Sequence, residues 1–89
     1  MAYNYAVQRP NVFTEDGQVM FLKIRDTAHA LISKSGAATC SKIISGCTGD
    51  SWDMLACVDR LVEIGEILEV PNTLSGAGQH RLFTSFDRL

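Results

Sequence analysis

The side chains most often used for chemistry are three cysteines and two histidines. Cys40, Cys47 and Cys57 have spacings that match no zinc or iron–sulfur pattern, and no CxxC pair occurs. His29 and His80 are far apart, and neither stands near a cysteine and a carboxylate at a spacing typical of catalysis. A nucleophile elbow and a phosphate-binding glycine loop are also missing from the sequence. The sequence therefore predicts no enzyme, no metal site and no cofactor.

The cysteines leave two interpretations open. Cysteine often acts as a small buried hydrophobic residue, and this interpretation is favoured for all three. Cys40 also stands in the first turn of an expected helix, where the helix dipole can lower the pKa of a thiol, so a redox sensor is the alternative. The odd number of cysteines, with no visible secretory signal, indicates free thiols and a cytoplasmic protein.

Length and charge limit the choice of function. Eighty-nine residues allow one small domain, and a partner chain is one source of additional stability. The formal net charge is −2, whereas proteins that bind nucleic acids usually carry a basic surface. No run of apolar residues approaches the ~18 that a membrane span requires, so no membrane partner is expected.

The first 13 residues are predicted to form an extended N-terminal arm. Tyr3, Tyr5 and Val7 alternate with polar or small residues, and Pro10 is expected to break any helix. The arm is either a loose terminus or a segment whose aromatic side chains dock on this subunit or on a second one.

A helix is predicted to begin at 14–16 and to end at about Ser35, with Gly36 as the stop. Val19 and Leu22 lie away from its core face, which indicates either a dimer contact shared with Tyr3 and Tyr5 or a broad core stripe. The residues expected to enter the core are Phe21, Ile24, Ala28, Leu31 and Ile32.

Two more helices are predicted between residues 39 and 65. Thr39 caps a short helix that runs from Cys40 to about Gly46, and a turn at 48–50 leads to a helix from Ser51 to Gly65. The short helix points Ile43 and Ile44 inward, and the longer helix buries the face that contains Met54, Val58 and Leu61.

Strands are predicted at 66–70 and 79–85, joined by a glycine-rich hairpin tip at 73–78. Residues 37–38 can add a single bridge as a minimal third strand.

Residues 16–85 resemble the winged helix-turn-helix superfamily of bacterial and archaeal transcription regulators. The most specific segment is 58–70, which reads VDRLVEIGEILEV. In it a helix ends at a glycine that permits a left-handed conformation, and an apolar strand follows. The resemblance implies a small α+β winged-helix domain at 14–86, with three helices and a wing of two or three strands, followed by a tail at 87–89.

The resemblance also implies a DNA-binding transcription regulator, expected to be a dimer. In this family the second helix of the pair lies in the major groove of double-stranded DNA and the wing touches the backbone or minor groove. Arg60 would contact a phosphate or a guanine, and Ser51 a phosphate. The full set of expected DNA contacts is Lys42, Ser51, Trp52, Ala56, Arg60, Gln79, His80 and Arg81.

The helix predicted from Ser51 to Gly65 also supports a second hypothesis. Asp53, Asp59 and Glu63 place three carboxylates near a surface that would have to approach phosphates, and Arg60 is the only arginine among them. An exposed Trp52 is typical of protein interfaces. The alternative function is therefore a winged-helix module that binds a protein partner and has little affinity for DNA.

Overall fold

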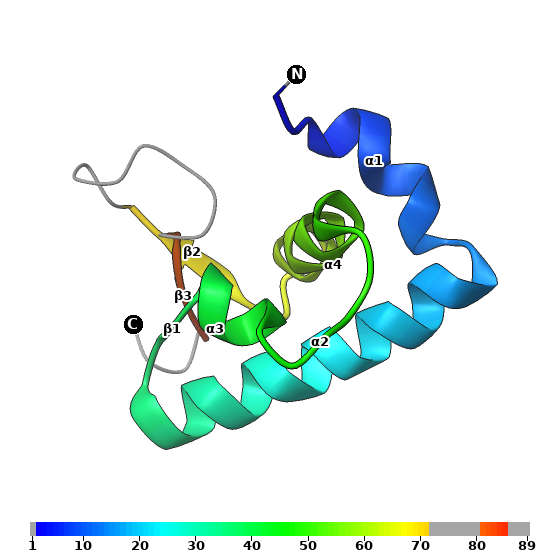
Figure 1. The fold of residues 1–89 in the computed structure, drawn as a ribbon. Coiled ribbons are helices and arrows are strands. Elements are labelled where there is room, and N and C mark those ends of the chain that lie inside the picture. The colour runs from blue at the N-terminus through cyan, green and yellow to red at the C-terminus, as the bar shows by residue number, and fades with distance from the viewer. Residues whose placement is uncertain (1, 72–80, 86–89) are drawn as a thin grey trace.

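The computed structural model describes residues 2–71 and 81–85, and these residues form a small α+β fold (Figure 1). The predicted α+β class is confirmed, but the described residues contain four helices where three were expected. The elements are α1 (Tyr5–Val12), α2 (Glu15–Ser35), β1 (Ala38–Thr39), α3 (Cys40–Ile44), α4 (Ser51–Glu63), β2 (Leu68–Val70) and β3 (Leu82–Thr84).

Helix α2 begins and ends where its sequence predicts. The hydroxyl of Thr14 accepts a hydrogen bond from the backbone N–H of Gly17, and Gly36 ends the helix in the left-handed region. Leu31 is partly buried and packs against the core. The four other residues predicted for the core face are all buried: Phe21, Ile24, Ala28 and Ile32.

Helices α3 and α4 also form close to their expected positions. The side chain of Thr39 caps α3 as predicted, although α3 ends at Ile44 rather than near residue 46. Asp50 caps α4 by accepting hydrogen bonds from the backbone N–H groups of the next turn. The helix ends at Glu63, and Gly65 then adopts a φ of 80° as the chain turns toward β2.

The three strands form an antiparallel sheet in the order β1-β3-β2. The short third strand is therefore present, with Ala38 paired to Phe83 and Thr39 to Leu82. On the other side of β3, Leu68 pairs with Thr84. The predicted hairpin tip at 73–78 and residues 79–80 lie outside the described residues.

Helix α1 corrects the prediction of an extended arm. Asn4 caps the helix by accepting a hydrogen bond from the N–H of Ala6, and Pro10 lies inside the helix instead of preventing it. Tyr5, Arg9 and Val12 have the spacing i, i+4, i+7, which places them on one face. This face meets α4, because Tyr5 and Arg9 bind a carboxylate of α4.

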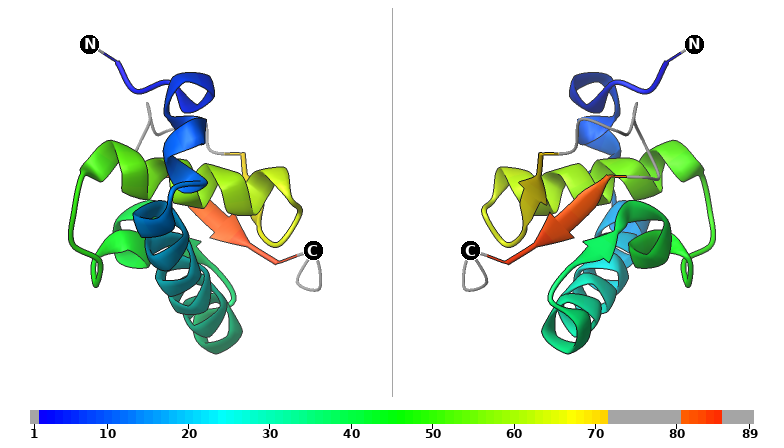
Figure 2. Two further views of the ribbon diagram at one scale, coloured as in Figure 1. Left: turned by 90° about the vertical axis from the view of Figure 1, so that its right-hand side faces the viewer. Right: turned by 90° about the vertical axis from the view of Figure 1, so that its left-hand side faces the viewer.

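Helix α4 lies between α1 and α2 (Figures 1 and 2). The interior is apolar, and its largest fully buried side chains are Phe83, Ile24, Ile43, Leu61, Ile67 and Val12, together with Val58 and two cysteines. Among the described helices, none has the combination of length and apolar character needed to cross a membrane.

Candidate functional site: the outer face of helix α4

The outer face of α4 consists of Asp53, Ala56, Asp59, Arg60 and Glu63. Helix α1 runs across α4 (Figure 2), and both α1 and α2 contact α4. Ala56 was expected to be exposed, but it is completely buried. It lies one helical turn from Asp53, Asp59 and Arg60, which contact α1 or the residues next to it, so Ala56 is on the side of α4 that faces α1.

Four side chains before and within α1 donate hydrogen bonds to carboxylates of α4. Tyr3 Oη donates to Asp59 Oδ2 over 2.6 Å, and Asn11 Nδ2 donates to Asp53 Oδ1 over 3.0 Å. Tyr5 Oη donates to Glu63 Oε1 over 2.7 Å. Arg9 Nε lies 3.0 and 3.1 Å from the two oxygens of the same carboxylate. Every donor in this set is on the α1 side, and every acceptor is on α4.

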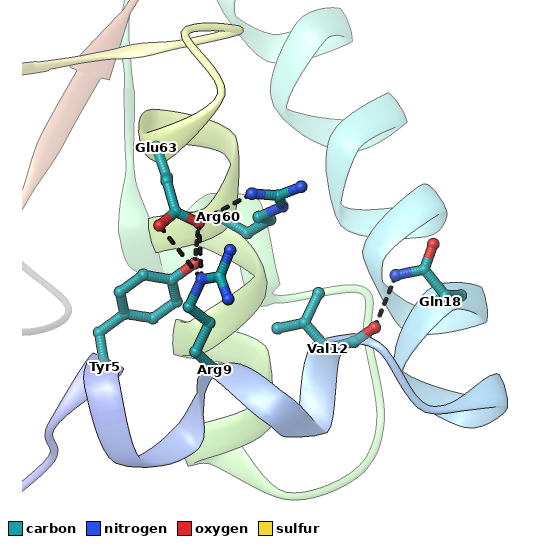
Figure 3. A network of polar contacts seen from close by, with 6 residues as sticks. All are labelled: Tyr5, Arg9, Val12, Gln18, Arg60 and Glu63. Carbon is teal, nitrogen blue, oxygen red and sulfur yellow. Dashed lines mark hydrogen bonds and ion pairs between the residues drawn. The ribbon is translucent and has the colours of Figure 1, made fainter.

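Glu63 is the centre of this network (Figure 3). Besides Tyr5 and Arg9, its Oε1 accepts a hydrogen bond from Arg60 Nη1 at 2.9 Å. The hydrogen bonds from Tyr5, Arg60 and Arg9 lower the pKa of Glu63 to about 2. Burial, followed by the hydrogen bond to Glu63, raises the pKa of Tyr5 to about 12. The carboxylate therefore stays ionised and the phenol stays protonated across the ordinary range of pH.

Phe13 lies beside this network at the corner between α1 and α2. The guanidinium carbons of Arg9 and Arg60 each lie 5.0 Å from the centre of its ring. Cation–π contacts at this distance hold the two arginines near Phe13, although the ring remains 48% exposed. Arg60 is thus engaged by Glu63 and Phe13 together.

Arg81, one of the expected DNA contacts, forms a second network. Its guanidinium lies 2.6 Å from Asp59 Oδ1 and 2.8 Å from Glu69 Oε1. Hydrogen bonding to Glu69 raises its pKa further above the ordinary value for arginine. The side chain is only 18% exposed and connects α4 to β2.

The structure places the remaining DNA candidates in different surroundings. Lys42 and Ser51 are exposed, and Trp52 is half-buried at the start of α4. Gln79 and His80 lie outside the described residues. The six candidates among the described residues therefore do not share one open surface, since Ala56 is covered and Arg60 and Arg81 bind carboxylates.

Two pairs of residues were expected to contact a second subunit, and the structure separates them. The hydroxyls of Tyr3 and Tyr5 bind carboxylates of their own chain, so the aromatic residues dock on this subunit. Val19 and Leu22 are 69% and 46% exposed on the outer side of α2.

The three cysteines are free, and two of them are buried. Burial raises the pKa of Cys40 to about 11 and that of Cys57 to about 12. Their burial favours the interpretation of Cys40 and Cys57 as small hydrophobic residues of the interior. His29 Nε2 lies 3.1 Å from Glu66 Oε1. In the described part of the chain, histidine, cysteine, aspartate and glutamate form no group of three able to hold a metal ion.

The cover over α4 is the feature that the sequence analysis missed. The signals were Asn4 as a capping residue and the i, i+4, i+7 spacing from Tyr5 to Val12. Pro10 and the alternation of Tyr3, Tyr5 and Val7 pointed instead to an extended segment. Comparison of the chain with protein-family models, curated proteins and solved structures gave no match. Function is therefore inferred from the residues and their geometry.

Proposed function

We propose that this chain is a winged-helix protein-interaction module that uses the outer face of α4 and has little affinity for double-stranded DNA. The order of its elements supports the winged-helix part of the proposal. From α2 to β3 the chain runs helix, strand, helix, helix, strand, strand, with β3 in the middle of the sheet. This is the order that the resemblance of residues 58–70 implies, with α4 in the position of the second helix of the pair.

One observation carries the choice of a protein partner: the outer face of α4 is already bound by a protein helix. Its three carboxylates accept hydrogen bonds from α1 and from Tyr3 just before it, and its arginine, Arg60, is bound to Glu63. Carboxylates repel the phosphate backbone, whereas they are natural acceptors for tyrosine, arginine and asparagine side chains. A surface of this composition favours a protein ligand.

A DNA-binding regulator is the second candidate, favoured by the exposure of Lys42 and Ser51. These residues lie at α3 and at the first position of α4, where backbone phosphates would approach a helix-turn-helix pair. In this candidate the molecule would be a dimer, with the exposed Val19 and Leu22 available for the contact.

A titration of the isotope-labelled full chain with random-sequence duplex DNA at ~50 mM salt separates the candidates, because non-specific DNA binding is strongest at low salt. We expect the amide signals of residues 51–60 to stay unchanged. Shifts that cluster on those residues and weaken in Lys42→Gln would overturn the proposal in favour of the DNA-binding regulator. Arg25→Gln is the matched control, because it removes a positive charge on α2 whose only described ion pair is with its neighbour Asp26.

A further inference from the structure

The outer side of α2 carries a row of exposed residues, which we call the α2 stripe. Its members are Val19, Lys23, Asp26 and Ala30, and their spacing of i, i+4, i+7, i+11 is the spacing that paired helices use. The buried residues of α2 lie on the opposite side of the helix. Figure 1 shows α2 along one edge of the molecule, with the other helices and the sheet on one side of it. Within the described structure, the α2 stripe is therefore an open surface.

The charges of α2 alternate in sign along this outer side. Asp16 lies in the first turn and Lys34 in the last, with Lys23 and Asp26 between them. Asp26 pairs with its neighbour Arg25 but keeps a side chain that is 72% exposed. Read from either end, the signs alternate, and the two readings are opposite. An antiparallel second copy of α2 therefore meets each charge with one of opposite sign, whereas a parallel copy in register meets each charge with its own sign.

One antiparallel register matches the apolar and the charged positions together. A twofold axis midway between positions 24 and 25 brings the first residue of the stripe opposite the last, and the second opposite the third. The acidic first turn then lies within one residue of the basic last turn of the second copy. Because the arrangement is twofold, each contact is made twice. The pairs across the contact are Val19–Ala30, Lys23–Asp26 and Asp16–Lys34.

We infer that the α2 stripe binds the α2 stripe of a second copy of this chain in antiparallel orientation, forming a twofold dimer. Leu22, which is 46% exposed, borders the stripe in both copies and adds to the apolar contact of Val19. The contact is small beside the roughly 1,200–2,000 Å² that stable interfaces bury, so the dimer dissociates on dilution. Its ion pairs are exposed, so salt weakens it. The inference goes beyond the proposed function, because it uses no residue of the outer face of α4.

The first test measures the register directly in the unmodified chain. Val19 and Ala30 are separated by roughly 16 Å along the axis of one helix, which is too far for a nuclear Overhauser effect within a chain. In a mixture of isotope-labelled and unlabelled chains, we expect an isotope-filtered effect between the methyl groups of these two residues. The antiparallel register produces this signal, whereas a parallel pair would place Val19 against Val19. Its absence at concentrations where sedimentation shows a dimer would overturn the inference.

The second test reverses charges in the stripe. Lys23→Asp places two carboxylates opposite each other at two symmetric positions, and we expect the dissociation constant of the dimer to rise about tenfold. Lys23→Asp combined with Asp26→Lys restores opposite charges and should return the constant to within about twofold of the unmodified chain. Lys42→Asp is the matched control, because it makes the same change of charge at an exposed position of α3. Sedimentation velocity measures the constants, and circular dichroism checks that each variant keeps its helices.

Three results would contradict the dimer or its register. A monomer at every concentration up to ~1 mM would overturn the dimer itself. A loss in Lys23→Asp that the double variant does not restore would overturn the antiparallel register, and an equal loss in Lys42→Asp would mean that net charge alone decides association. The proposed function is read separately from the DNA titration at residues 51–60, so either can fail without the other.

Discussion

Helix α4 is held by two helices in opposite ways. Against α2 it packs fully buried aliphatic side chains, such as Leu61 on α4 and Ile24 on α2. Against α1 it presents carboxylates that accept hydrogen bonds from half-exposed donors, such as Arg9 to Glu63. The α1 contact therefore adds polar interactions to the burial of Val12 and Ala56, whereas the α2 contact is mainly apolar.

The energies of the two contacts differ in size and in kind. Burial of an aliphatic side chain is worth about 1.5–3 kcal/mol, depends on area rather than direction, and is little affected by salt. Exposed ion pairs are worth about 0–1 kcal/mol and weaken with salt. The α1 contact combines both kinds, since Val12 and Ala56 are buried while the carboxylates of α4 accept hydrogen bonds at its edge.

The largest effect is expected from the apolar contact. Ile24→Ala should lower the free energy of unfolding by about 2–5 kcal/mol, because it leaves a cavity beneath α4. Val19→Ala, on the exposed side of the same helix, should change it by no more than about 0.5 kcal/mol. Urea denaturation of both variants measures the difference. Equal losses would mean that the outer side of α2 is also covered.

A smaller loss is expected at the network between α4 and β2. Arg81→Ala leaves Asp59 and Glu69 without their guanidinium, and we expect a loss of about 1–3 kcal/mol, toward the lower end because Glu69 is 39% exposed. Arg25→Ala is the control, since the Arg25–Asp26 pair is far more exposed. Equal losses in the free energy of unfolding for the two variants would mean that Arg81 does not stabilise the fold. They would favour its predicted role as a DNA contact.

The sequence predicted the apolar side of this comparison well. The limits of α2 follow from Thr14 and Gly36, and its core face follows from a 3.6-residue period. Capping residues and apolar periodicity were enough to predict the limits and the buried face of α2, because this helix buries one continuous apolar stripe. Ile43 and Ile44 were found in the same way.

The polar side could not be predicted from local pattern. The eight-residue α1 contains Pro10 and only one buried residue, so its helical form depends on partners 42 to 58 residues away. For the same reason Ala56 was expected to face solvent. It lies outside the apolar stripe of α4, and no residue near it in the sequence predicts that a second helix packs on that side. The sequence analysis predicted Arg81 as a DNA contact, but it did not predict that Asp59 and Glu69 bind its guanidinium.

The α1 contact should respond to pH in a way that the α2 contact does not. The pKa of Glu63 in the folded chain, about 2, lies below its ordinary value of 4.5, so its contribution is fully present above pH 4.5 and is lost as the pH falls toward 2. Amide signals of α1 should therefore shift over that range before those of α2. Glu63→Gln should remove this early change, whereas Glu66→Gln, next to His29, should keep it. Simultaneous loss of both helices in the unmodified chain would contradict a role of Glu63 that is specific to α1.

The smallest effect tests the independence of the two contacts. Cys57 lies in the α2–α4 interior, with its sulfur 4.0 Å from the carbonyl of Gly17, and burial raises its pKa to about 12. At pH 8, iodoacetamide followed by mass spectrometry should modify Cys47, which is only partly buried, well before Cys57. Glu63→Gln should leave that order unchanged, while Ile24→Ala should accelerate the labelling of Cys57. If Glu63→Gln exposed Cys57 as well, the polar contact between α1 and α4 would also be needed to keep the α2–α4 interior closed.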